Sequence, residues 1–184
     1  FTETTVYDFD VLKRRLREMA FLTKGLRIIL EDERAEEVID TDVENQQISE
    51  LLKRAEEDSS EIIKKQKKVE FYYEGGIKEF VTYLNKSKTP LYDNVLYFEG
   101  EKNHVYVEVA FQHNDSYNES VFSFVNNINT PEGGTHLMGF RNAMTKTFND
   151  YARSAKLLKE SEPNLSGEDI REGLTAIISV KIED

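Results

Sequence analysis

The sequence lacks cysteine and tryptophan, and it holds only three prolines in 184 residues. Without cysteine it cannot build a disulfide framework, a thiolate zinc site or a cysteine nucleophile. No stretch approaches the roughly 20 consecutive apolar residues that a membrane span needs. The N-terminus, Phe1–Thr5, has neither the basic region nor the apolar core of a signal peptide, and it lacks an initiator Met. We therefore expect a cytoplasmic protein and a sequence that begins at a fragment boundary.

Basic residues are outnumbered as well. Lysine and arginine number 24 against 35 acidic residues, which gives a formal net charge of −11. Such a chain has no global electrostatic attraction to DNA. Any nucleic-acid contact must come from a local basic patch or from other parts of a larger protein. The hydrophobic fraction of 39% is that of an ordinary globular domain.

Hydrophobic spacing predicts an α+β fold, with one mixed β-sheet covered by two or three helices. Helical spacing begins after Asp8 or Asp10 and ends at Gly25, and it returns at Ile77–Leu84 and from Thr135 to Ala155. The long helix from Thr135 is expected to bury one stripe, made of Leu137, Phe140, Met144, Phe148, Tyr151 and Ala155. Strands are expected at Leu26–Leu30, Val69–Tyr73, Val95–Phe98, Val105–Phe111, Ser120–Val125 and Thr175–Ile182.

Residues 35–68 differ from the rest of the chain because they are dense in charge and contain neither glycine nor proline. Acidic residues lead and a lysine cluster follows, an order that suits the helix dipole. We predict a charged helical insertion here, within a single domain that spans residues 1–184. Its role is left open between a solvated appendage and a partner-binding surface.

Catalytic motifs are scarce. The sequence has no Walker loop, no glycine-rich fingerprint after a strand and no nucleophile elbow. Its three histidines, His104, His113 and His136, lack metal-ligand spacing, so we interpret them as exposed or half-packed side chains and predict no metal site. A metal-dependent hydrolase is a weak alternative that rests on these histidines alone.

The segment Gly133–Gly134–Thr135–His136 precedes the long helix. Two glycines at a helix start can bring free N–H groups to an anion, and Thr135 can act as the N-cap. A tight strand-to-helix turn is the plainer interpretation and is favoured on spacing alone.

Arg141 lies one turn inside the same helix, next to the apolar stripe. The plain interpretation is a partly buried arginine paired with a carboxylate, for which the candidates are Glu132, Glu172 and Asp169. The functional interpretation is a residue that faces DNA or couples two parts of a machine. The basic run Lys13–Arg17 is by default a solvated helix face.

Four stretches of the chain resemble the transducer domain of gyrase B subunits, which belong to the type II topoisomerases. They are Tyr7–Arg34, Tyr73–Tyr92 (YEGGIKEFVTYLNKSKTPLY), Val107–Ala152 and Ser166–Asp184 (SGEDIREGLTAIISVKIED). The resemblance covers nearly everything except residues 35–68, and its motifs are long and contiguous. The corresponding subunit of topoisomerase IV is a near relative.

The resemblance implies a βαβ core with a left-handed crossover, like a domain of a small-subunit ribosomal protein. It also implies a role: relaying the nucleotide state of a preceding ATPase domain to a DNA-cleaving core. The implied partners are DNA, the gyrase A subunit and that ATPase domain in cis. In this family Gly133–His136, Arg141 and Gly167–Gly173, which includes Glu172, fall in the most recognisable segments and suggest structure and coupling. Arg141, Lys146 and Arg153 are candidates to face DNA.

The resemblance also implies what this chain lacks. A Gln-Thr-Lys loop that reaches the ATP γ-phosphate is expected beyond Asp184, and the adenine pocket and magnesium ligand are expected before Phe1. The chain alone is therefore expected to be a monomer that needs ATP and magnesium only in the complete protein, and to have no catalytic or cofactor-binding residues of its own. An independent nucleic-acid or protein interaction module with the same core is the alternative from another class.

Overall fold

The computed structural model describes residues 6–34 and 67–183. These residues pack as two units. The first contains residues 6–13, 29–34 and 67–70, and the second contains residues 14–28 and 71–183. The predicted single domain with a helical insertion stays a prediction, because residues 35–66 lie outside the described residues.

The first unit contains a helix start and a two-stranded sheet. Helix α1 (Phe9–Leu22) begins after Asp8, whose Oδ1 accepts a hydrogen bond from the backbone N–H of Val11 at 2.9 Å. The predicted helix start after Asp8 or Asp10 is thus confirmed at Asp8, whose side chain satisfies a free N–H of the first turn. Strands β1 (Ile28–Asp32) and β2 (Lys67–Phe71) pair with each other in a sheet of their own.

Two strand predictions need correction at this point. The strands expected at Leu26–Leu30 and Val69–Tyr73 are each shifted by two residues, and they do not join the main sheet. Their short apolar runs marked strands correctly but carried no information about pairing. The partner is fixed by tertiary structure, where Lys68 Nζ of β2 meets Glu31 Oε2 of β1 at 2.7 Å.

The second unit is built on a five-stranded mixed sheet in the order β3-β4-β7-β5-β6. The strands are β3 (Leu96–Lys102), β4 (Val105–His113), β5 (Ser120–Val125), β6 (Ile128–Asn129) and β7 (Leu174–Ile182). Strands β5 and β7 are parallel neighbours, and the chain between them carries α4 (Thr135–Ser154) and α5 (Gly167–Arg171). This is the expected βαβ unit in a mixed sheet, and the handedness of its crossover stays a prediction.

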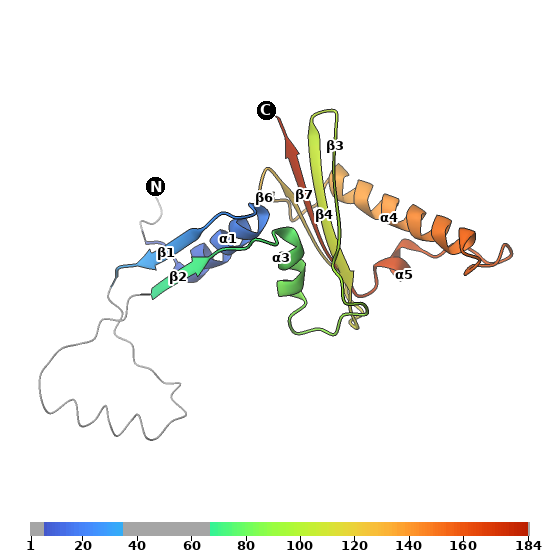
Figure 1. Ribbon diagram of the computed structural model, residues 1–184, viewed down its shortest axis with the longest axis horizontal. Coiled ribbons are helices and arrows are strands. Elements are labelled where there is room, and N and C mark those ends of the chain that lie inside the picture. Colours follow the sequence, from blue (N-terminus) through green and yellow to red (C-terminus); the bar gives the residue numbers. More distant parts are fainter. Residues whose placement is uncertain (1–5, 35–66, 184) are drawn as a thin grey trace, which may run out of the picture. The chain divides into compact units, whose positions relative to one another are not determined.

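Helices cover both faces of this sheet (Figure 1). On one face, Phe21 and Leu22 at the end of α1 and Phe80 and Val81 of α3 (Ile77–Leu84) form a cluster with sheet residues Ala110, Phe124 and Ile177. The other face packs Met144 of α4 and Ile170 of α5 against Phe111 and the alternate residues of β7. Strand β7 is therefore buried from Leu174 to Val180, as expected for a central strand covered on both sides.

The predicted buried stripe of the long helix is correct only in its first half. Leu137 and Phe140 are partly buried and Met144 is buried. Phe148, Tyr151 and Ala155 are exposed, with 67% of Tyr151 accessible. The reason is geometric: the ring of Phe148 lies 6.1 Å from that of His113 at the end of β4, and the part of α4 beyond it runs past the strands (Figure 1).

A buried polar network closes one end of the sheet. The side chain of Asn85, just after α3, donates to Gln112 at 3.0 Å and accepts from Thr175 at 2.7 Å. Asn114 donates to Thr175 at 3.1 Å and to Asn85 at 3.3 Å. All four residues are at most 4% exposed, so their hydrogen bonds are made in a water-poor environment. The network joins α3, β4 and β7.

Candidate functional site

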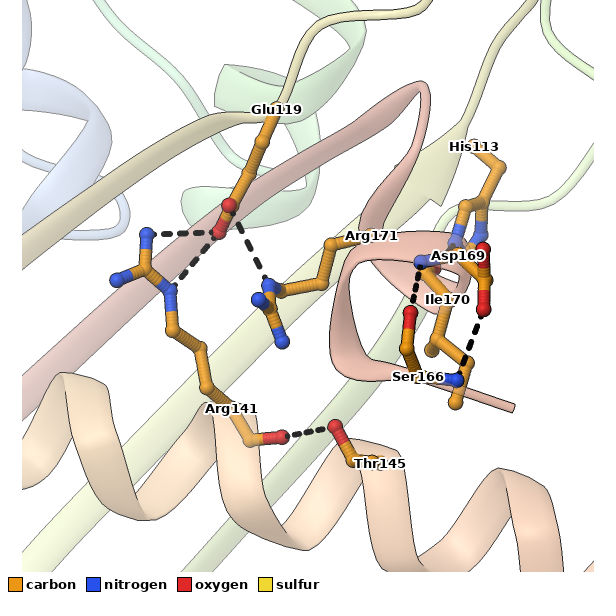
Figure 2. A network of polar contacts seen from close by, with 8 residues as sticks. All are labelled: His113, Glu119, Arg141, Thr145, Ser166, Asp169, Ile170 and Arg171. Atoms are coloured by element: carbon orange, nitrogen blue, oxygen red, sulfur yellow. Dashed lines mark hydrogen bonds and ion pairs between the residues drawn. The ribbon is translucent and has the colours of Figure 1, made fainter. Parts of the chain in front are cut away.

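The candidate site is an ion-pair cluster in which one carboxylate meets two arginines (Figure 2). Arg141 of α4 approaches Glu119 Oε1 through Nε at 3.0 Å and through Nη2 at 2.9 Å. Arg171, at the end of α5, donates from Nε to Glu119 Oε2 at 3.3 Å. Glu119 lies in the loop between β4 and β5, so one side chain connects this loop to both helices.

The environment of the cluster is intermediate between core and solvent. The side chains of Glu119, Arg141 and Arg171 are 26%, 38% and 17% exposed. At such exposure the ion pairs are stronger than fully exposed ones, yet they remain open to competition from other anions.

The plain interpretation of Arg141 as a paired, partly buried arginine is confirmed, but its partner was predicted wrongly. None of Glu132, Glu172 and Asp169 pairs with it; Glu119 does. No local signal in the sequence identifies Glu119, because it lies 22 residues from Arg141 and 52 from Arg171. Only the sheet topology brings them together.

The turn before α4 differs from the prediction in one detail. The N-cap is Gly134 and carries no side-chain cap hydrogen bond, so the expected cap at Thr135 is wrong. Gly133 adopts φ 76°, a left-handed conformation that favours glycine. His136 Nε2 lies 3.0 Å from the hydroxyl of Thr130, which in turn donates to the carbonyl of Ser123 at 2.8 Å. His136 thus fastens the turn to β5.

Helix α5 is held by a capping box and by a histidine. Ser166 and Asp169 exchange backbone and side-chain hydrogen bonds of 2.9 and 3.1 Å, the reciprocal pattern of a capping box. His113 (Figure 2) has its Nε2 2.9 Å from the carbonyl of Ile170. Its Nδ1 lies 2.9 Å from the hydroxyl of Tyr92. Since a carbonyl only accepts, Nε2 donates the proton in the contact with Ile170. Glu172 is exposed and caps the other end of α5 through its backbone N–H.

The capping box makes α5 sensitive to acid. Hydrogen bonds from Ser166 hold the pKa of Asp169 below its ordinary value. A lowered folded-state pKa contributes stability above the unfolded pKa, and this is lost as the pH falls through the folded value. We expect Asp169→Asn to lower the urea midpoint at neutral pH, and the difference from wild type to shrink as the pH falls below about 4, the ordinary pKa of an aspartate. If the difference in urea midpoint persisted unchanged at acid pH, the loss of stability would come from the changed shape of the side chain and not from its lost charge.

The two other basic candidates on α4 are engaged in different ways. Lys146 is 77% exposed and pairs with Asp150 one turn along the same helix. Arg153 contacts the following loop, where it donates to Asn164 Oδ1 at 2.9 and 2.6 Å and to the carbonyl of Glu162 at 2.9 Å. The described geometry therefore gives Arg153 a role in shaping the loop, and it leaves Lys146 on the surface.

The histidines do not converge. His104 lies at the β3–β4 turn, 3.8 Å from Glu183, whereas His113 and His136 have the separate partners described above. Across residues 6–34 and 67–183, no three His, Asp or Glu side chains gather as metal ligands would. Within the same ranges no helix is long and apolar enough to cross a membrane.

Two cavities accompany these features. A groove of about 530 Å³ beside α5 is lined by apolar side chains that include Leu91, Tyr117 and Phe148, with Asp169 and Glu172 at its edge. A second cavity of about 370 Å³ contains Tyr97, whose hydroxyl lies 2.6 Å from Glu99 and 2.8 Å from Glu108. Burial raises the pKa of Tyr97, and both carboxylates add to the effect.

Comparison with known proteins identifies the family. The family model described as DNA gyrase B matches residues 76–184, more than half of the chain. The DNA gyrase B protein of Halalkalibacterium halodurans is 50% identical over the whole chain, and that of Clostridium acetobutylicum is 48% identical over 99% of it. The chain spans 24% of the length of each relative.

Solved structures agree with this. The structure described as the 43K ATPase domain of Thermus thermophilus gyrase B, in complex with an aminocoumarin, has a TM-score of 0.74 and 30% identity. The match covers 99% of this chain and 42% of that one. The gyrase B-subunit of Myxococcus xanthus and a topoisomerase IV ATP-binding domain of Francisella tularensis share the fold, at TM-scores of 0.68 and 0.64 and 20% identity each. They cover 98% and 99% of this chain, which covers 42% and 40% of theirs. The resemblance noted in the sequence is confirmed, and the chain belongs to the DNA gyrase B family.

Proposed function

We propose that this chain is the transducer domain of a DNA gyrase B protein. In the complete protein it would couple ATP binding and hydrolysis in an N-terminal ATPase domain to DNA strand passage and negative supercoiling. The observation that carries the proposal is the similarity to the Thermus thermophilus structure. It extends along nearly the whole chain, yet it leaves more than half of that ATPase structure unmatched. The unmatched part has room for the nucleotide-binding core. Membership of the family leaves the transducer of topoisomerase IV as the alternative.

The architecture suits a coupling role. The central strand β7 is buried on both faces, which makes it a stiff support. Helices α4 and α5 lie on one face of the sheet and are joined to the β4–β5 loop through Glu119. A displacement applied to one of these elements would be passed to the others through packed contacts and ion pairs.

The proposed partners follow from the family. They are DNA, the gyrase A subunit, and the ATPase domain in cis, and the complete protein would use ATP and magnesium in the cytoplasm. Among the basic residues of α4, Arg141 is our first choice to approach DNA. Each of the three basic residues has a partner within the chain: Glu119 for Arg141, Asp150 for Lys146 and Asn164 for Arg153. Arg141 is preferred because it shares its carboxylate with a second cation, Arg171.

A binding measurement tests whether the nucleotide site lies outside this chain. The isolated chain, expected to be monomeric, should give no heat of binding with a non-hydrolysable ATP analogue and magnesium in a calorimeter. The complete gyrase B protein is the matched control and should give saturable binding. Saturable binding by the isolated chain would overturn the proposal, since the nucleotide site would then lie within these residues. Failure of the complete protein to bind would overturn it as well.

A further inference from the structure

The Glu119 cluster carries more positive charge than negative charge. Two guanidinium groups, each with five N–H donors, face one carboxylate. Glu119 accepts a hydrogen bond from Nε of Arg141 and one from Nε of Arg171, and Arg141 Nη2 lies 2.9 Å from Glu119 Oε1. The other donors of both arginines make no hydrogen bond within residues 6–34 and 67–183. The cluster therefore has unused donors and a net charge of one positive unit.

The surroundings carry charges of both signs. Helix α5 carries Glu168 and Asp169 in its first turn, and Glu172 follows it. Lys88 Nζ lies 3.3 Å from the hydroxyl of Ser120, and Lys146 is exposed on α4. With a chain net charge of −11, the two arginines are the cations that share one counter-ion at this place. The charge of their counter-ion then decides how strongly they attract a polyanion.

We propose that Glu119 acts as an internal counter-ion that sets the strength of the DNA contact made by Arg141 and Arg171. The inference rests on the proposed function, because it presumes that this surface meets DNA. The planar fork of arginine fits a carboxylate and a phosphate alike, so a backbone phosphate competes with Glu119 for the same N–H groups.

Glu119 has two effects on such a contact. It holds two arginines from two helices in one place, so little side-chain ordering is needed when a phosphate arrives. It also cancels one of their charges, so each phosphate is held weakly. Weak holding is what a protein that must capture and then release a DNA segment requires. Glu119 is thus a positioning residue that acts through Arg141 and Arg171.

Glu119→Gln tests the proposal because glutamine keeps the shape and one acceptor oxygen but removes the charge. The complete gyrase B protein, assembled with gyrase A, is titrated with short duplex DNA at increasing potassium chloride concentration. We expect DNA binding by Glu119→Gln to be about three- to tenfold tighter at low salt. We also expect a salt slope steeper by about 0.9 for each further phosphate neutralised. A purely structural role predicts weaker or unchanged binding and an unchanged slope.

Two controls separate this effect from others. Glu31→Gln removes an equal charge at the surface pair with Lys68, in the β1–β2 sheet, and should change the affinity and slope much less. Glu119→Asp keeps the charge and should behave like wild type in slope. Equal gains for Glu119→Gln and Glu31→Gln, or any loss of affinity in folded Glu119→Gln, would overturn the inference.

A further variant distinguishes failure of the inference from failure of the proposed function. Arg141→Gln should weaken DNA binding and DNA-stimulated ATP hydrolysis if this surface meets DNA. If Arg141→Gln leaves both unchanged while Glu119→Gln also has no effect, the surface does not meet DNA and both ideas fall. If Arg141→Gln weakens binding but Glu119→Gln does not strengthen it, only the counter-ion role falls.

Discussion

Replacing Gly173 with alanine is expected to lower the free energy of unfolding by about 3 kcal/mol. Gly173 adopts φ +69°, and a Cβ there would lie 2.3 Å from the carbonyl oxygen of Asn114 and 2.6 Å from that of Ser116. The left-handed backbone costs about 1 kcal/mol for a residue with a side chain, and overpacking costs about 1–3 kcal/mol more. Both atoms in the way are backbone atoms, so no side chain can move aside.

The measurement is urea-induced unfolding of the chain, followed by circular dichroism. Gly139→Ala is a matched control with the opposite expected sign. Gly139 lies inside α4, has nothing within 4 Å of a built Cβ, and should gain about 0.5–1 kcal/mol as alanine. A loss of less than about 1 kcal/mol for Gly173→Ala would mean that the β4–β5 loop moves away easily from α5, against the close packing described above.

The second large effect is expected at Asn85. Asn85→Ala removes three hydrogen bonds of the buried network, to Gln112, Thr175 and Asn114. Because buried groups left without a partner cost about 1–3 kcal/mol each, we expect a loss near 3 kcal/mol after partial rearrangement. The same urea measurement reports it.

Two comparisons identify the cause. The double variant Asn85→Ala, Thr175→Val should lose less stability than the sum of the two single variants. The reason is that Thr175→Val removes the hydroxyl that Asn85→Ala leaves without its acceptor. Ser179→Ala should be neutral or slightly stabilising, since Ser179 Oγ is buried and has no hydrogen-bond partner among the described residues. Additive losses at Asn85 and Thr175 would show that the network is a set of independent contacts.

Elements with a strong local signal were predicted well from sequence. Ile77–Leu84 and Ser120–Val125 match their predicted bounds, and β4 follows the clean alternation of Val105, Val107 and Val109. The capping box of Ser166 and Asp169 is equally local, because its three-residue spacing is itself the physical cause of the cap. In each case the interaction that forms the element lies within the element.

Features that depend on distant residues were predicted poorly. The second half of α4 has the spacing of a buried stripe, yet Tyr151 is exposed because the helix leaves the sheet beyond the contact of Phe148 with His113 at the end of β4. The carboxylate that pairs with Arg141 was sought among three acids, and it is a fourth, Glu119. Periodicity tells which face of a helix is apolar but not whether another element reaches that face.

The sequence by itself determined the fold class, most of the helices and strands, and the family to which the chain belongs. Local spacing, caps and turn residues act over a few positions and so determine the helices and strands. The long contiguous motifs identify the family. Only the tertiary structure decided that β1 and β2 form a sheet apart, that β7 is buried between two helical layers, and that Glu119 meets both Arg141 and Arg171. These contacts join residues far apart in the chain, and their geometry depends on how strands order themselves in a sheet, which no local pattern encodes.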